Sequence, residues 1–405
     1  MRILGMISGT SHDAIDAAIV EFTAGPDGAL AGRIEYTAAA EYPPDLRKAL
    51  IAALPPAPVG FDVACELDTL IGQAFADAAA RALAAHAAQP GAGPVDAICS
   101  HGQTVFHWVQ DGTARGTLQL GQPAWIAEAT GLPVISDVRA ADIAAGGQGA
   151  PLVPVLDQML LEPLRARGQR AAALNLGGIA NLTVCAPGAD PVAWDIGPAN
   201  ALIDAVVTAS PDTPGTFDRD GALAAAGAVV PDLLAGLLAE PYYAQRAPKS
   251  TGKELFHLGY VQDALRRAAA PALADQVATL TELTARTVAD AIAAADLSAV
   301  VASGGGVRNP VLMRRLAELL PGVRLTVTDE LGVPSDAKEA VAFALIGWAT
   351  LHGLPGSVPT CTGASGPRVL GRVSPGRDGS VPQPARLAAW PAGVSFTAAG
   401  PEPGR

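Results

Sequence analysis

The sequence predicts an α/β protein that consists of two similar domains. Its length of 405 residues exceeds the roughly 250 to 300 residues that one hydrophobic core usually supports. One order of strands, glycine-rich turns and helices occurs at the N-terminus and again near residue 170. Hydrophobic residues make up 50% of the chain but aromatic residues only 4%, which suits small-residue helices packed on sheets.

The first copy of this order begins at residue 1. The apolar run MRILGMIS is followed by a turn-rich GTSHDA, a second strand candidate AIDAAIVEF, another turn and RIEYTAAAEY. Short apolar runs between such turns are typical of hairpin-connected strands, so we expect an antiparallel meander. Helical spacing follows in PPDLRKALIAAL and in the long CELDTLIGQAFADAAARALAAHAA. VDAICS, TLQLG and LPVIS are further strand candidates, with the helix candidate PAWIAEAT between the last two.

The second copy begins near residue 170. AAALNL, LTVCAP and PVAWDIG are its three strand candidates, the glycine turn GGIAN lies between the first two, and the helical NALIDAVVTA follows. Residues 219 to 296 are mostly helical in pattern, and SAVVASGGG is a buried strand that ends in a glycine turn. The recurrence predicts a pseudo-duplicated fold.

Two such copies describe the two-domain architecture shared by actin, hexokinase and acetate kinase, a duplicated ribonuclease H-like fold with an interdomain cleft. A doubly wound parallel sheet would instead place a helix directly after the first glycine turn. We expect a first domain over residues 1–165, with the segment of about 345–375 packing back on it, and a second over 166–344 that carries the GGG turn. The Pro/Gly/Ser-rich residues 376–405 are expected to be a poorly ordered tail.

Charge and cysteine usage exclude several classes of function. The formal net charge of −12 would repel nucleic acid and anionic lipid, so we expect neither as a partner. The N-terminus turns polar after eight residues, too early for a signal peptide, which favours a cytoplasmic location. The four cysteines lie far apart in the sequence, which indicates neither a disulfide framework nor a zinc site.

The first glycine-rich turn, within residues 5–16, is a candidate phosphate-binding turn. Gly9, Thr10 and Ser11 offer amides and hydroxyls to phosphate oxygens, and Asp13 and Asp16 follow at the edge of the next strand. Phosphoryl transfer requires such donors together with carboxylates for magnesium. The alternative is an ordinary polar hairpin.

The second and third glycine-rich turns belong to the second copy. NLGGIAN contains Gly177 and Gly178, and the neighbouring DIGPAN places Asp195 at a strand end beside Gly197. A carboxylate there suits a general base or a ligand of a magnesium-bound water, whereas the alternative is a helix N-cap. The third turn follows a buried strand and is a candidate seat for adenine and ribose; its glycines are Gly304, Gly305 and Gly306.

Other motifs, present or missing, narrow the class of function. His101, Gln103 and Thr104 in SHGQT follow a strand, where polar side chains either contact a substrate or hydrogen-bond within a loop. The string APKSTGKE lacks the upstream glycine of a Walker A loop. GGQGAP fails the dinucleotide fingerprint, and signatures of metalloproteases, α/β-hydrolases and protein kinases are missing.

Together these strings resemble the anhydro-N-acetylmuramic acid kinase family up to about residue 375. The resemblance rests on SHGQT, NLGGIANLTV, DIGPAN, PYYAQRAPKSTGKELF, GGGVRNPVLM, EAVAFALIGWA and the long string that begins at LQLGQPAW. It implies an actin/hexokinase-like fold, magnesium-ATP as a cofactor and a homodimer. It also implies an ATP-dependent reaction that opens 1,6-anhydro-N-acetylmuramic acid and gives N-acetylmuramic acid 6-phosphate in peptidoglycan recycling.

Carried over by position, the resemblance implies a role for individual residues. Asp195 becomes the catalytic base, and Thr104, Arg139 and Glu339 are expected to contact the sugar. Asp13 and Asp195 are expected to hold magnesium through water. The ATP phosphates are expected against the first turn, which comprises Gly9, Thr10, Ser11, His12, Asp13, Ala14, Ile15 and Asp16.

The chain departs from the usual family residues at some positions within these strings. They are His12, Ala14, Gln122, Ile196 and Ala199. A methyl group added at a phosphate turn can block close approach or forbid a positive φ. Two alternatives therefore stay open: a kinase of the same fold for another amino sugar, and a nucleotide-gated regulatory protein without catalysis.

Overall fold

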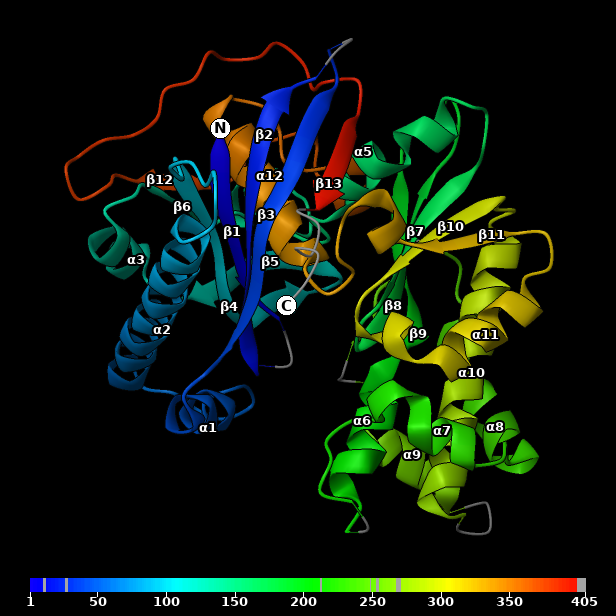
Figure 1. Cartoon of the computed structure of the whole chain (residues 1–405). Helices are drawn as coiled ribbons and strands as arrows, with labels where there is room; N and C mark the ends of the chain where they lie inside the picture. The colour runs from blue at the N-terminus through cyan, green and yellow to red at the C-terminus, as the bar shows by residue number, and fades with distance from the viewer. Residues whose placement is uncertain are drawn as a thin grey trace. The chain divides into compact units, whose positions relative to one another are not determined.

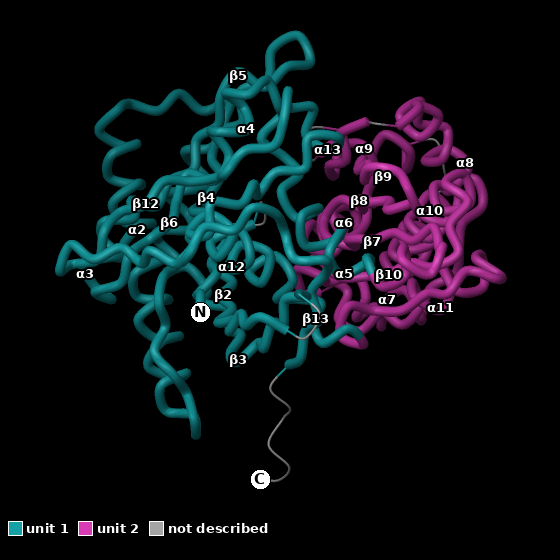
Figure 2. Tube along the Cα trace, turned by 90° about the horizontal axis from the view of Figure 1, so that it is seen from above, with its two compact units in different colours: residues 1–162, 331–405 teal, residues 163–330 magenta. Residues whose placement is uncertain are grey.

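The computed structural model describes residues 1–9, 12–25, 28–211, 213–247, 249–252, 255–266 and 271–398. The chain divides into two compact units (Figure 2). Unit 1 comprises Met1–Glu162 and Leu331–Arg405, and unit 2 comprises Pro163–Glu330. Each unit contains one sheet, and the two sheets are described separately below.

The sheet of unit 1 has the strand order β12-β6-β4-β1-β2-β3-β13, and β5 pairs with β4 alone. β1, β2 and β3 form the antiparallel meander expected from the sequence, while β4 is parallel to β1 and β6 is parallel to β4. The strands are β1 (Arg2–Ser8), β2 (Ala14–Ala24), β3 (Leu30–Glu41), β4 (Ala97–Gln110), β5 (Thr113–Leu120), β6 (Val134–Ser136), β12 (Arg372–Ser374) and β13 (Val394–Ala398).

The sheet of unit 2 has the order β11-β10-β7-β8-β9. β7, β8 and β9 form a second antiparallel meander, β10 is parallel to β7, and β11 is parallel to β10. This order repeats the β6-β4-β1-β2-β3 core of unit 1 strand for strand. The predicted duplicated ribonuclease H-like fold is therefore confirmed. The strands are β7 (Ala171–Leu176), β8 (Ile179–Cys185), β9 (Val192–Pro198), β10 (Ala299–Ser303) and β11 (Arg324–Val327).

Helices cover both faces of the sheet in unit 1, with α12 against one face and α2 against the other (Figure 1). The alternation of strand side chains explains this division, because Ile3 and Ile7 of β1 join the core beneath α12 while Leu4 and Met6 join the core beneath α2. The helices of this unit are α1 (Pro44–Ala52), α2 (Phe61–Ala87), α3 (Pro123–Thr130), α4 (Ala140–Ala144), α12 (Lys338–Leu351) and α13 (Pro359–Thr362).

In unit 2, α10 and α11 pack together, and their apolar side chains share a core with the strands β7 to β10. A second core joins α6, α8, α9 and the N-terminal half of α10. The helices are α6 (Asn200–Ala209), α7 (Ala222–Ala226), α8 (Pro231–Leu238), α9 (Leu258–Leu265), α10 (Leu273–Ala294) and α11 (Pro310–Leu319), and α5 (Pro154–Arg165) contains the boundary between the units.

Three observations differ from the expectations of the sequence. SHGQT is not a loop after a short strand but lies within the 14-residue β4. α12 belongs entirely to unit 1, although residue 344 was the expected limit of the second domain. The tail beyond residue 376 was expected to be poorly ordered, yet β13 pairs with β3, because Val394 and Phe396 supply apolar side chains that become buried.

Among the described residues, no single helix has both the length and the apolar character needed to cross a membrane. The bent pair Arg219–Ala226 and Pro231–Leu238 meets that test when the two helices are taken together.

Gly5 is the point of closest approach between β1 and α12. A methyl group at Gly5 would overlap the carbonyl oxygen of Ala340 and the backbone nitrogen of Ala344. Because both neighbours are main-chain atoms of a helix, they cannot rotate away as a side chain could. Only glycine therefore lets the helix lie this close to the sheet.

We expect Gly5→Ala to lower the free energy of unfolding by about 2 to 3 kcal/mol, because α12 must move away from its core. The midpoint of urea unfolding measures the effect. Gly236→Ala in α8 is the matched control, since a methyl group there meets nothing within 4 Å and alanine favours a helix by about 0.5 to 1 kcal/mol. An unchanged midpoint for Gly5→Ala would mean that α12 can shift at little cost.

Candidate active site

The first turn of unit 1 lies between the end of β1 and the start of β2. Gln103 is completely buried beneath it, and its side-chain amide donates to Gly9 O at 3.2 Å. The Ser8 hydroxyl lies 2.7 Å from the Gln103 carbonyl oxygen. Gln103 therefore holds the base of the turn, and its predicted contact with the substrate stays a prediction. Thr10 and Ser11 lie outside the described residues.

The backbone of the turn has its left-handed residue at His12, where φ is 55°. Ala14 already belongs to β2 and pairs with Glu41, so its methyl group requires no positive φ. Ile15 is buried and contributes its side chain to the core beneath α2. Of the four residues 12 to 15, only Asp13 is exposed, and its carboxylate accepts the Ala14 N–H at 2.9 Å.

Asp16 stands in a group of carboxylates in unit 1. Burial, followed by the negative charges of Glu339, Asp13 and Asp336, raises the pKa of Asp16 to about 7. Asp16 lies on β2 and Asp13 in the turn before it, while Glu339 lies in the first turn of α12 and Asp336 just before that helix. The fold thus collects acidic groups that repel one another beside the candidate phosphate turn.

Arg139 is held in one orientation by two hydrogen bonds. Its Nε donates to His101 Nε2 at 2.8 Å, and Nη1 donates to Gly149 O at 2.6 Å. Because a guanidinium can only donate, His101 Nε2 must accept, so Nδ1 carries the proton and donates to Gly102 O at 2.9 Å. Burial lowers the pKa of Arg139 to about 10, and the nearby Glu339 opposes that shift.

Glu339 faces the same region as Arg139. Burial raises the pKa of its carboxyl, while Arg139 and then Lys338 act in the opposite direction. Sequence reasoning expected Arg139 and Glu339 to contact a sugar, and in unit 1 the two side chains are electrostatic neighbours. His101 is exposed to only 3%, so it lies behind Arg139 and acts on its orientation.

Thr104 belongs to the polar face of the β4–β5 hairpin. Its Oγ1 accepts the side-chain amide of Gln119 at 3.1 Å, and the same amide donates to Thr117 Oγ1 at 2.8 Å. His107 pairs with Thr117 across the hairpin, and its pKa is lowered by burial and by Arg139. No local sequence pattern indicates His107 and Gln119, because a bulge between Thr104 and Phe106 determines which side chains share this face.

In unit 2, Asp195 lies on β9 in a polar row across the sheet. Asn175 of β7 pairs with Asn181 of β8, and Asn181 pairs with Asp195. Directly opposed residues of antiparallel strands project from the same face, so these three side chains are neighbours. A bulge at Ile196 separates this row from the pair formed by Gly197 and Ala180.

A second set of contacts to Asp195 comes from the KST string that fails the Walker pattern. The carboxylate oxygen Oδ2 accepts the Ser250 hydroxyl at 2.9 Å and the Thr251 N–H at 3.1 Å. The string is not a Walker A loop, and its contribution to the family resemblance does not by itself indicate a contact with Asp195. The string lies more than fifty residues from Asp195 in the sequence, so no local pattern indicates that the two are in contact.

The glycine turns of unit 2 pack against β7 and α6. The carbonyl oxygens of Gly177 and Gly178 accept the first N–H groups of α6, including that of Asn200 at 3.0 Å. Gly304 has φ of 84°, and a methyl group there would lie 2.5 Å from Asn175 Oδ1. Gly306 is buried against Leu176, whereas Gly305 is exposed and a methyl group there would only touch the Asn200 side chain, at 3.8 Å. Only glycine fits at Gly304, since both the left-handed φ and the close approach require it.

The comparisons with known proteins agree along nearly the whole chain. The family model described as anhydro-N-acetylmuramic acid kinase matches residues 1–376. The chain belongs to the anhydro-N-acetylmuramic acid kinase family. A relative of that name from Streptomyces coelicolor is 53% identical over 386 residues, which cover 95% of this chain and 97% of the relative. Another, from Xanthomonas campestris, is 45% identical over 377 residues and covers 92% and 97%.

Similarity to solved structures is much weaker. A ROK family glucokinase from Streptomyces griseus in complex with glucose and AMPPNP is 17% identical, with a TM-score of 0.33, covering 85% of this chain and 98% of that one. The fold of this member of the kinase family is assigned from its strand order and not from that similarity.

Two departures from the usual family residues lie in buried positions of unit 2. Ile196 is exposed to 3% and Ala199 to 1%, and both side chains belong to the core of the sheet. Their methyl groups therefore point into packed apolar surroundings. These two substitutions are accommodated by the core of the unit.

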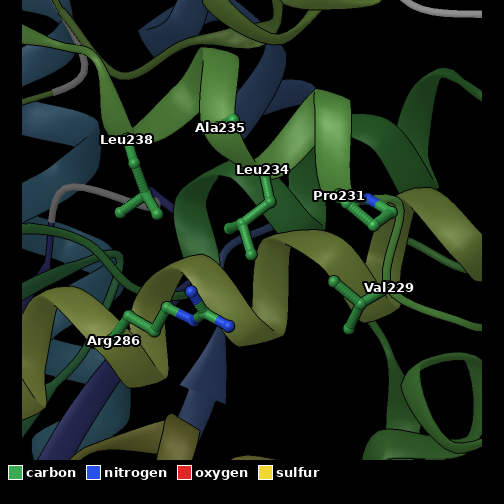
Figure 3. A pocket seen from close by; sticks show the side chains of 6 residues that line it. All are labelled: Val229, Pro231, Leu234, Ala235, Leu238 and Arg286. Atoms are coloured by element: carbon green, nitrogen blue, oxygen red, sulfur yellow. The ribbon is translucent and has the colours of Figure 1, made fainter.

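A surface hollow of unit 2 is a different kind of site (Figure 3). It lies between α8 and α10 and contains no residue of the candidate active site. Apart from Arg286, which donates to Glu282 at 2.6 Å, its lining is apolar. The lining residues are Val229, Pro231, Leu234, Ala235, Leu238 and Arg286. The chemistry of a kinase requires polar groups that this hollow does not offer.

The carboxylates of unit 1 are the kind of ligand that magnesium prefers, but they do not form a complete set of protein ligands for it. Within the described ranges, no three His, Cys, Asp or Glu side chains could hold a metal ion. Magnesium prefers oxygen ligands, keeps several waters and is commonly held by one or two carboxylates together with substrate phosphates. The mutual repulsion around Asp16 fits a cation of this kind, because a positive charge would relieve it.

The neutral state of His101 gives a test of the Arg139 arrangement. Burial and Arg139 hold the pKa of His101 well below its usual 6.5. Below that pH the unfolded chain binds a proton that the folded protein does not, so stability falls as the pH falls.

We expect the free energy of unfolding of the wild type to fall relative to that of His101→Gln by up to about 1.4 kcal/mol per pH unit below pH 6.5. Glutamine keeps an acceptor for Arg139 but does not titrate. Urea unfolding of both proteins between pH 7.5 and pH 5 measures the difference. A difference that stays constant over this range would contradict the buried neutral imidazole.

Proposed function

We propose that this protein uses ATP to open 1,6-anhydro-N-acetylmuramic acid and to phosphorylate its 6-oxygen in peptidoglycan recycling. The observation that carries the proposal is the full-length match to the family, with 53% identity to a relative of that name. The chain contains groups that the reaction requires: an oriented carboxylate on β9, a partly buried guanidinium and glycine turns at strand ends. We also propose that it acts in the cytoplasm, where ATP is supplied, and as a homodimer.

The substrate chemistry determines what the residues must do. One oxygen atom bridges the anomeric carbon and C6, so the sugar has no free hydroxyl at the position to be phosphorylated. We assign Asp195 as the base that takes a proton from water. The water oxygen then bonds to the anomeric carbon and the bond to the bridge oxygen breaks. The bridge oxygen of the sugar then bonds to the γ-phosphorus of ATP. The bond between the γ-phosphorus and the oxygen that links it to the β-phosphorus breaks, and ADP leaves.

Residues of unit 1 bind the ligands in this proposal. Arg139 has the geometry to pair with the lactyl carboxylate, and His101 fixes its orientation. Thr104 and Glu339 hydrogen-bond the sugar. The turn over residues 9–16 binds the ATP phosphates through its backbone, and the turn in unit 2 that contains the exposed Gly305 binds the nucleoside.

We assign Asp13 and Asp195 as the residues that hold magnesium, through water. Bound magnesium supplies positive charge that offsets the charge developing on the β- and γ-phosphates. The negative charges of Glu339 and Asp13 help to raise the pKa of Asp16, and the positive charge of a bound magnesium ion would offset this repulsion.

A kinase for another amino sugar is the second candidate, favoured by the departures from the usual residues at His12 and Gln122. Neither residue lies in a packed core, since His12 is partly exposed and Gln122 is exposed.

The purified protein should release ADP with anhydro-N-acetylmuramic acid, and at least about tenfold more slowly with N-acetylglucosamine or without sugar, because only the first carries both bridge and carboxylate. A coupled assay for ADP measures the rates. Excess chelator should abolish turnover, since a bound magnesium ion would supply the positive charge that offsets the charge on the phosphates. Faster turnover with N-acetylglucosamine would favour the second candidate, and equal ADP release without sugar would contradict both.

Turnover in water enriched in oxygen-18 should place the label on the anomeric hydroxyl and leave the phosphate ester oxygen unlabelled. This follows because the water oxygen joins the anomeric carbon while the bridge oxygen becomes the ester oxygen. Mass spectrometry of the product and of its dephosphorylated form locates the label. Label in the ester oxygen would show that the sugar opens before a separate phosphorylation of a hydroxyl derived from water.

A further inference from the structure

Asp195 is fixed by an unusually complete set of hydrogen bonds to one segment of unit 2. Its N–H donates to Lys249 O at 3.0 Å, and its carbonyl oxygen accepts the Tyr242 hydroxyl at 2.8 Å. Its side-chain Oδ2 accepts the Ser250 hydroxyl at 2.9 Å and the Thr251 N–H at 3.1 Å. Main chain and side chain of Asp195 are thus both held by residues 242 to 251.

The segment that holds Asp195 is itself anchored. Lys249 Nζ donates to the carbonyl oxygens of Tyr242 and Tyr243 at 2.9 and 3.2 Å. It also lies 4.3 Å from the centre of the Tyr242 ring, in the position of a cation–π contact. Tyr242 is buried and packs edge-on against Phe256. Lys249 therefore links the two ends of the segment, and the packing of Tyr242 on Phe256 holds the segment against the aromatic core.

The two donors on Oδ2 differ in what they can contribute. The Thr251 N–H is a main-chain group whose position follows from the fold of the segment. The Ser250 hydroxyl is a side-chain group of an exposed residue, so no core packing depends on it. Hydrogen bonds from two sides restrict the rotation of a carboxylate, and a general base works only when its oxygen points at the proton it takes.

We propose that Ser250 is a positioning residue that fixes the Asp195 carboxylate for catalysis. The proposal rests on the proposed function, in which Asp195 is the base. Ser250 does not touch the substrate in this view and acts only through Asp195. Lys249 and Tyr242 form the support that brings Ser250 to it.

Kinetics of Ser250→Ala test the role directly. We expect kcat to fall about tenfold while the KM values for sugar and ATP stay within about twofold, because orientation and not binding is lost. Ser250→Thr keeps the hydroxyl and should recover kcat to within about threefold of the wild type. Ser298→Ala is the matched control, an exposed serine of unit 2 whose hydroxyl donates to Arg170 O at 3.1 Å, and its kinetics should not change. A raised KM with unchanged kcat would overturn the proposal.

A double-mutant cycle tests whether Ser250 acts through Asp195 or independently of it. Asp195→Asn alone should lower kcat about 100 to 10,000-fold. Adding Ser250→Ala to that variant should cost less than about twofold more, since the group that Ser250 positions is already disabled. A further tenfold loss would show that Ser250 acts independently of Asp195. If Asp195→Asn were as active as the wild type, the assignment of the base would fail instead.

A crystal structure of Ser250→Ala gives a readout that does not depend on kinase activity. We expect the Asp195 carboxylate to rotate or to occupy more than one orientation, while the Thr251 N–H stays in place. An Asp195 side chain unchanged from that of the wild type would overturn the positioning role, even in a protein with no turnover on any sugar tested.

Discussion

The close approach of α12 to β1 at Gly5 is the constraint on which the candidate site of unit 1 depends. Glu339 is the second residue of α12, and Ala340, whose carbonyl faces Gly5, follows it directly. The depth at which the helix packs therefore sets how near Glu339 comes to Asp16 and Arg139. Carboxylates that repel one another would separate if they were free to move. Here the apolar contacts of α12, which is almost entirely buried, oppose that separation.

The two units have the same fold but differ in the turn between their first two strands. In unit 1 the first hairpin turn spans the residues between Ser8 and Ala14, whereas in unit 2 only the residues between Leu176 and Ile179 connect the equivalent strands. The short turn directs its carbonyl oxygens to the first N–H groups of α6, which are thereby satisfied within the protein. The long turn has an exposed carboxylate and a buried glutamine beneath it. The two units thus share one strand order and differ in the length of the turn between their first two strands.

Much of the fold was predictable because strands and turns leave local signals. The two meanders follow from apolar runs that are separated by glycine turns, and their recurrence predicts the duplication. The site was less predictable, because burial and register are properties of the folded chain. His101 and Gln103 look like exposed loop residues in the sequence, but β4 continues through them and buries both. Ser250 reaches Asp195 across 55 positions, a relation that one sequence does not reveal.

The C-terminal strand has a consequence for the edge of the unit 1 sheet. β13 pairs with Leu30–Ile34 of β3, the ring of Phe396 lies against Gly32, and the family match ends earlier, at residue 376. A chain cut at that point would retain all the candidate catalytic groups and yet leave Leu30–Ile34 of β3 without a partner on that edge. Unpaired strand edges can recruit other chains and promote aggregation, and β13 covers this part of the edge with a strand of only five residues. The last strand thus contributes solubility and not chemistry.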